Sequence, residues 1–178
     1  MDIYKTRNDF INTLDNGLVM CEIGVFNGDF SRILFNRAPK ELHLIDPFIG
    51  SFWSGDKDGS NMQYANLEIS YQHLKQTYAQ YNYVSIHKGF SETVLLTFPD
   101  YYFDFMYIDA NHDYKNVKQD LAICRQKTKI NGIISGHDYS NKFPGVVQAV
   151  NEFCIQHRLS ISTITQDGCP TFGIINHE

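Results

Sequence analysis

The stretch "VMCEIGVFNGDFSR", Val19–Arg32, decides the fold of this chain. An apolar run ends in the acid Glu22, and Gly24 and Gly28 follow before a segment with helical spacing begins. The next apolar run, "LHLIDPF", ends in a second acid, Asp46. A strand, a glycine turn, a helix and another strand form the unit from which parallel sheets are built. The stretch therefore predicts an α/β fold with both acids at the carboxyl ends of strands.

The rest of the chain continues this alternation. After a short helix that Thr6 can cap, strand-like segments alternate with helical ones until the last two strands, which the turn "QDGCP" joins directly. The predicted strands are 18–24, 41–46, 83–89, 103–109, 132–136, 160–165 and 171–175. We expect an α/β, doubly wound, mostly parallel seven-stranded sheet with a C-terminal antiparallel hairpin. It forms a single domain over residues 1–178, in which residues 1–16 are a short N-terminal helix.

Composition excludes several classes of protein. The chain has 178 residues, 43% of them hydrophobic and 20% charged, which is typical of a globular domain. The net charge of -5 argues against a nucleic-acid partner. A membrane span would need about eighteen consecutive apolar residues, and no such run exists. The N-terminus does not resemble a signal peptide, and the four cysteines form no C-x-x-C pair. We therefore expect a cytoplasmic protein with reduced cysteines.

The opening stretch predicts a binding site for a nucleoside. In open α/β sheets, ligands bind beyond the carboxyl ends of the strands, where Glu22, the glycines and Asp46 lie. Glycines allow a ligand to approach the backbone, and an acid in the position of Asp46 can accept hydrogen bonds from ribose hydroxyls. The string E-x-G-x-x-x-G lacks the glycine pattern of a dinucleotide site, and Glu22 suits a ligand with a positive end. The structural alternative is a tight glycine turn without a ligand.

The segment "EIGVFNGDFS" resembles the first motif of class I S-adenosylmethionine-dependent methyltransferases, and "LIDPF" resembles the second. The resemblance extends from about Gly17 to the end of the chain, and the terminal hairpin belongs to it. It implies a Rossmann-like methyltransferase fold and S-adenosylmethionine as the cofactor. The implied cofactor-binding residues are Glu22, Gly24, Gly28 and Ser31 at the amino-acid end, Asp46 at the ribose, Gly89, Phe90 and Ser91 beside the adenine, and Asp109.

Two further motifs, "YIDANHDY" and "SGHDYS", end the fourth and fifth predicted strands. Because these strands are neighbours in the methyltransferase topology, Asp109 and Asp138 can converge on one cation, with His137 as a third ligand. Carboxylate ligands favour Mg²⁺, or Ca²⁺ or Mn²⁺. Asp109, His112 and His137 are the candidate catalytic residues, and either histidine could take a proton from the substrate.

Each of these assignments has a structural alternative. Asp109 could cap a turn, and Asn111 or Asp113 could simply start the next helix. His137 and Asp138 are adjacent on a strand, so we expect one of them to face away from a shared ligand.

The segments "IDANHDYKNVKQDL" and "NGIISGHDYSNKFPGVVQAVNEF" resemble small metal-dependent O-methyltransferases, which include macrocin-type sugar methyltransferases and cephalosporin-hydroxylase-like proteins. Asn131-Gly132 departs from the family's glycine pair. This resemblance implies metal-assisted O-methylation of a sugar or small-molecule hydroxyl. A hydroxylase-like relative and a non-catalytic module that binds the cofactor or a partner are the alternatives. Few residues precede the first strand, so a homodimer could complete the pocket.

The segment "FIGSFWSGDKDGSN", residues 48–61, follows the ribose acid directly. Its aromatic residues Phe48, Phe52 and Trp53 lie among glycines and charges. We expect a flap that closes over the cofactor. The alternative is a surface loop whose aromatic side chains pack on the sheet.

Overall fold

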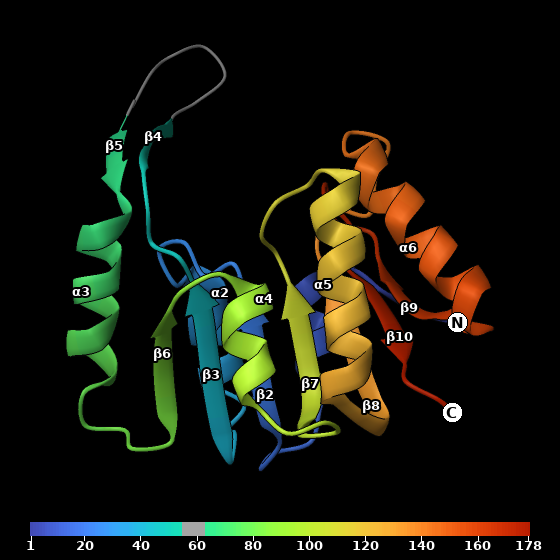
Figure 1. Cartoon of the computed structure of the whole chain (residues 1–178), viewed down its shortest axis with the longest axis horizontal. Helices are drawn as coiled ribbons and strands as arrows, with labels where there is room; N and C mark the ends of the chain where they lie inside the picture. The colour runs from blue at the N-terminus through green and yellow to red at the C-terminus, as the bar shows by residue number, and fades with distance from the viewer. Residues whose placement is uncertain (55–62) are drawn as a thin grey trace.

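The computed structural model describes residues 1–54 and 63–178, which form an α/β fold around one large sheet (Figure 1). Its eight strands lie in the order β1-β9-β10-β8-β7-β2-β3-β6. The strands are β1 (Asp2–Tyr4), β2 (Val19–Ile23), β3 (Glu41–Asp46), β6 (Val84–Lys88), β7 (Phe103–Ile108), β8 (Thr128–Gly136), β9 (Ile161–Thr165) and β10 (Phe172–Ile175). Only β10 is antiparallel to its neighbours, β8 and β9. The predicted fold class and the C-terminal hairpin are confirmed.

The sheet has one strand more than the seven predicted. β1 pairs in parallel with β9, with Asp2 opposite Thr163 and Tyr4 opposite Thr165. The expected N-terminal helix over residues 1–16 is correspondingly shorter, because α1 covers only Arg7–Ile11. A capping box between Thr6 and Asp9 fixes the start of α1, so the residues before Thr6 are free to extend along the sheet.

Helices cover both faces of the sheet. They are α2 (Asp29–Phe35), α3 (Leu67–Tyr78), α4 (Ser91–Val94), α5 (Tyr114–Lys127), α6 (Pro144–His157) and the 3₁₀ turn η1 (Leu95–Thr97). One core cluster packs apolar residues of α5, α6 and η1 on the sheet, and the other packs residues of α1, α2 and α3 on the opposite face. In Figure 1, α4 and α5 cross in front of the strands and α2 lies behind them. No helix among the described residues is long and apolar enough to cross a membrane.

The parallel strands β3, β6 and β7 all point toward the same edge of the sheet, which is the upper edge in Figure 1. A separate hairpin of β4 (Ser51–Ser54) and β5 (Gln63–Asn66) rises above this edge. The predicted flap falls partly on this hairpin. Phe48 is buried in the core, where its ring packs against Tyr71. Residues 55–61 of the predicted flap and the side chains of Phe52 and Trp53 lie outside the described part of the structure.

Candidate active site

Asp46 ties together the loops that follow β2 and β3. Its Oδ2 accepts hydrogen bonds from the backbone N–H groups of Val25 (2.9 Å) and Phe26 (3.0 Å), and its Oδ1 accepts one from Phe48 (2.6 Å). The residue is only 8% exposed. A carboxylate oxygen has two acceptor positions, so these bonds leave one position on Oδ1 for a ligand hydroxyl. Asp46 therefore shapes the glycine loop and retains the capacity expected of a ribose-binding acid.

The two glycines of the loop allow close packing of the chain on itself. Gly24 has φ +87, and a Cβ there would lie 2.2 Å from the carbonyl oxygen of Asp109. Only glycine lets the end of β2 approach the end of β7 so closely. Gly28, with φ +85, faces Leu74 of α3, where a Cβ would lie 2.4 Å from the side chain. Gly24 also lines the cavities described below, whereas Gly28 packs against α3.

Glu22 and Ser31, both predicted to bind the cofactor, form a buried pair. The Ser31 hydroxyl donates to Oε2 of Glu22 at 2.5 Å, and the two residues are 0% and 1% exposed, respectively. Burial raises the pKa of Glu22 well above its ordinary value, against the opposing effect of the Ser31 hydrogen bond. Glu22 lines a cavity of about 340 Å³. Ser31 does not line this cavity, but its hydrogen bond orients the Glu22 carboxyl group.

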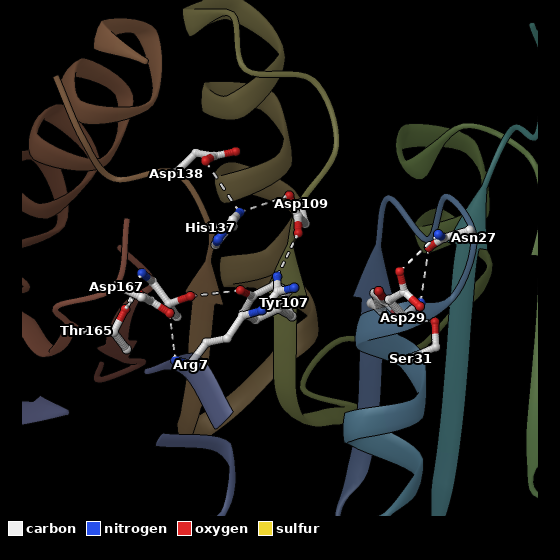
Figure 2. A network of polar contacts seen from close by, with 12 residues as sticks. Arg7, Asn27, Asp29, Ser31, Tyr107, Asp109, His137, Asp138, Thr165 and Asp167 are labelled. Carbon is white, nitrogen blue, oxygen red and sulfur yellow. Dashed lines mark hydrogen bonds and ion pairs between the residues drawn. The ribbon is translucent and has the colours of Figure 1, made fainter. Parts of the chain in front are cut away.

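Arg7 also lines this cavity, and sequence reasoning missed it. Its Nη1 lies 3.5 Å from Oδ2 of Asp109 (Figure 2). Its guanidinium lies 4.9 Å above the ring of Phe30. Burial would lower the pKa of Arg7, but Tyr107 and Asp109 raise it, so the side chain is a permanent cation. The capping box could predict that a helix starts at Arg7. It could not predict that this helix docks beside β7.

A larger cavity of about 590 Å³ opens along the carboxyl ends of β2, β3, β6 and β7. Six of the predicted cofactor-binding residues line it: Gly24, Asp46, Gly89, Phe90, Ser91 and Asp109. Asp109 and Ala110 also line the 340 Å³ cavity, so the two cavities meet at the end of β7.

The second pair of motifs also converges, as Figure 2 shows. Nδ1 of His137 lies 3.6 Å from Oδ1 of Asp109 and 3.4 Å from Oδ1 of Asp138. Potential ligand atoms of these three residues all lie within 4.8 Å of one another. On the far side of Asp138, Nε2 of His112 lies 2.8 Å from Oδ2. The predicted metal ligands and both candidate bases are thus in one cluster.

The expectation that His137 or Asp138 would face away is wrong. β8 ends at Gly136, so both residues lie beyond the regular strand. Asp138 has φ +62, in the left-handed region, and this turn directs its carboxylate back toward the two histidines. A non-glycine residue in this conformation is uncommon, and such residues cluster at functional sites.

Charge pairing dominates the electrostatics of this cluster. Burial would lower the pKa of His137, but hydrogen bonds to Asp109 and Asp138 raise it to about 9. Burial would raise the pKa of Asp138, yet hydrogen bonds from His112 and His137 hold it well below its ordinary value. The hydrogen bond to Asp138 also raises the pKa of His112. Asp109 and Asp138 therefore stabilise the positive charge of protonated His137, and the same two carboxylates could stabilise a bound cation.

The sequence of the chain matches a known protein family, and its fold is similar to those of solved structures. Residues 21–139 match the family model described as a methyltransferase domain. No curated protein sequence matches the chain. Solved structures share the fold: a methyltransferase candidate from Streptococcus mutans in complex with S-adenosylhomocysteine (SAH) is 12% identical, with a TM-score of 0.65 over 94% of each chain. The N-methyltransferase NodS from Bradyrhizobium japonicum is 14% identical, with a TM-score of 0.65 over 97% of this chain and 95% of that one.

Proposed function

This chain belongs to the methyltransferase domain family, and from that premise we propose that it transfers the methyl group of S-adenosylmethionine to a hydroxyl oxygen. The acceptor is a sugar or another small molecule, and a divalent cation at Asp109, His137 and Asp138 assists the reaction. The observation that carries the proposal is the position of Asp109. It lines both cavities and belongs to the cluster that can hold a cation.

The two cavities match the two ends of the cofactor. The adenosine end fits the 590 Å³ cavity, where Asp46 has an acceptor position for a ribose hydroxyl and Gly89–Ser91 border the base. The amino-acid end fits the 340 Å³ cavity, where Arg7 can pair with the carboxylate. The sulfonium then lies where the cavities meet, beside Asp109. The similar fold solved with SAH supports this assignment.

The residues of the cluster fit a divalent cation. Two carboxylates and one imidazole converge. The carboxylates suit Mg²⁺, Ca²⁺ or Mn²⁺, and the imidazole favours Mn²⁺ among them, because Mg²⁺ and Ca²⁺ are hard cations that prefer oxygen ligands. When both are bound, S-adenosylmethionine supplies a methyl group that passes from sulfur to the acceptor oxygen, and the cation polarises the acceptor hydroxyl. Asp109, His137 and Asp138 would hold the cation, with His137 in the neutral form that a metal ligand requires.

In this proposal His112 receives the hydroxyl proton. It lines the 340 Å³ cavity together with Asp109, and Asp138 orients its ring through Nε2. The protein's contribution is positioning: the glycine loop and Arg7 hold the methyl donor, while the cluster holds the acceptor oxygen in line with it. The hydroxylase-like function shares the fold and the cation cluster, and no observation favours it over methyl transfer. The homodimer, the absence of a nucleic-acid partner and the cytoplasmic location stay predictions.

Two measurements test the proposal. Calorimetry with SAH should give binding to the parent protein, and methyl-labelled S-adenosylmethionine should label a sugar or small-molecule hydroxyl in the presence of Mn²⁺ or Mg²⁺ but not EDTA. Binding of SAH without transfer to any acceptor would favour the non-catalytic module, and no binding would reject the cofactor assignment.

The Asp138→Ala variant isolates the cation. Asp138 belongs to the cluster but lines neither the 590 Å³ cavity nor the 340 Å³ cavity. This variant should therefore lose Mn²⁺ affinity and turnover while it keeps its affinity for SAH. Asp15→Ala is the matched control, because Asp15 is an exposed acid that precedes β2, at the opposite end of the strands. Unchanged Mn²⁺ binding in Asp138→Ala would remove the cation from the proposal.

A further inference from the structure

An acid occupies the buried face of α5. Val117, Leu121 and Cys124 form the apolar stripe of this helix, and Asp120 lies on the same stripe, three residues after Val117. Asp120 is only 5% exposed. Burial raises its pKa to about 6, because the charged form loses its hydration there. The protein would be more stable with an apolar residue at this position, so packing does not explain the presence of an acid.

The contacts of Asp120 leave much of its hydrogen-bonding capacity unused. Its Oδ1 accepts a hydrogen bond from the Ser91 hydroxyl at 2.5 Å. Glu92, which follows Ser91 in the chain, adds a like charge that raises the pKa of Asp120 further. Among the residues that the structure describes, no lysine or arginine forms an ion pair with Asp120. Ser91 thus orients the carboxylate, and Oδ2 has no hydrogen bond of its own to a described side chain.

Asp120 lines the 590 Å³ cavity at its Ser91 end. Asn116 and Gln119 of the same helix line this cavity too, so α5 presents a polar edge to whatever occupies it. Asp46 and Gly24, at the ends of β3 and β2, line another part of the cavity. A nucleoside whose ribose lies at Asp46 would direct its base toward the strand end at Gly89–Ser91 and the facing helix α5.

We propose that Asp120 determines which base the cofactor site accepts: its Oδ2 accepts a hydrogen bond from the exocyclic 6-amino group of adenine. This inference rests on the proposed function, because it needs adenosine in this cavity. An ionised carboxylate is an acceptor only, so it pairs with an amino group and repels a 6-oxo group at the same place. A buried polar group left unpaired by the wrong ligand is the usual basis of strong discrimination. Asp120 is therefore a specificity-determining residue, and Ser91 is its positioning residue.

The test compares two ligands that differ at this edge of the base, where the 6-amino donor and N1 acceptor of adenine are replaced by a 6-oxo acceptor and an N1–H donor. The probes are SAH and its 6-oxo analogue S-inosylhomocysteine, titrated by calorimetry at pH 8, where the Asp120 carboxyl is ionised. The parent should bind SAH roughly 10- to 100-fold more tightly than the analogue, the range expected for one hydrogen bond to a charged group. In Asp120→Asn the ratio should fall toward one, because an amide can turn either its oxygen or its nitrogen to the ligand.

Glu92→Gln is the matched control, since it removes a neighbouring charge that lines the same cavity but makes no predicted contact with the 6-amino group. It should keep the parent's ratio. A parent that binds both ligands equally, or an Asp120→Asn variant that keeps the parent's ratio, would overturn the inference and leave the proposed function intact. Failure of the parent to bind SAH at all would overturn both.

Discussion

The buried carboxylate of Asp120 should destabilise the folded protein at neutral pH, and Asp120→Asn should remove that cost. Its pKa is about 6 in the folded protein and 3.8 ordinarily. At ~1.36 kcal/mol for each pH unit, this difference corresponds to ~3 kcal/mol. The asparagine amide has nearly the same shape and can still accept the hydrogen bond from Ser91. For a chain of this length, ~3 kcal/mol corresponds to a rise in Tm of roughly 6–12 °C.

The sign of the pH dependence follows from linkage. Between pH 3.8 and 6 the folded protein binds more protons at Asp120 than the unfolded chain does, so stability falls as the pH rises through this window and then stays level. The advantage of Asp120→Asn should therefore be ~3 kcal/mol at pH 7.5 and only ~0.6 kcal/mol at pH 4.

The assay is a set of thermal and urea unfolding curves for the parent and Asp120→Asn at both pH values, with the exposed Asp15→Asn as control. The difference between the parent and the variant cancels the titration of groups that do not interact with Asp120. Equal differences at pH 4 and pH 7.5, or a less stable Asp120→Asn at pH 7.5, would refute the assignment of Asp120 as a desolvated acid.

The remaining predictions concern the loop and the N-terminal helix. Gly24→Ala should lower the free energy of unfolding in urea by ~3 kcal/mol or more, because its Cβ would lie 2.2 Å from the Asp109 carbonyl oxygen. Gly17→Ala is the control: with open space around it at φ +75, it should lower the same free energy by only ~1 kcal/mol. Similar losses in the two variants would argue against the close approach of Gly24 to Asp109. Arg7→Gln should weaken SAH binding roughly 10-fold in calorimetry, and an unchanged SAH affinity would exclude Arg7 from the amino-acid end. Thr6→Ala should cost ~1 kcal/mol through loss of the capping box, and thermal unfolding that matches the parent would contradict it.

The sequence could predict most of the sheet because the central strands are short, mostly apolar segments that alternate with segments of helical spacing. It could not predict β1, since three residues carry too little periodicity, and their pairing with β9 depends on a contact between the two ends of the chain. The same limit applies to α1. Its start was visible in Thr6 and Asp9, but its position beside β7 is a tertiary contact.

In the site, the sequence placed Asp109, His137 and Asp138 together because the ends of neighbouring parallel strands meet at one edge. It wrongly separated His137 from Asp138, since the rule of alternating faces holds only within a strand, and the left-handed turn at Asp138 lies beyond it. Asp120 did leave a signal: an acid three residues after Val117 interrupts an otherwise apolar stripe. Such an interruption in a buried helix face could have been used to identify it.

Asp109 contacts Arg7 through one oxygen and His137 through the other, and it borders the cavities assigned to both ends of the cofactor. Under the proposed function, one carboxylate is thus shared by two binding equilibria. Thermodynamic reciprocity then requires that the factor by which a cation changes the affinity for SAH equals the factor by which SAH changes the affinity for the cation. A cell's supply of divalent ions would set not only the rate of methyl transfer but also how strongly the spent cofactor is retained.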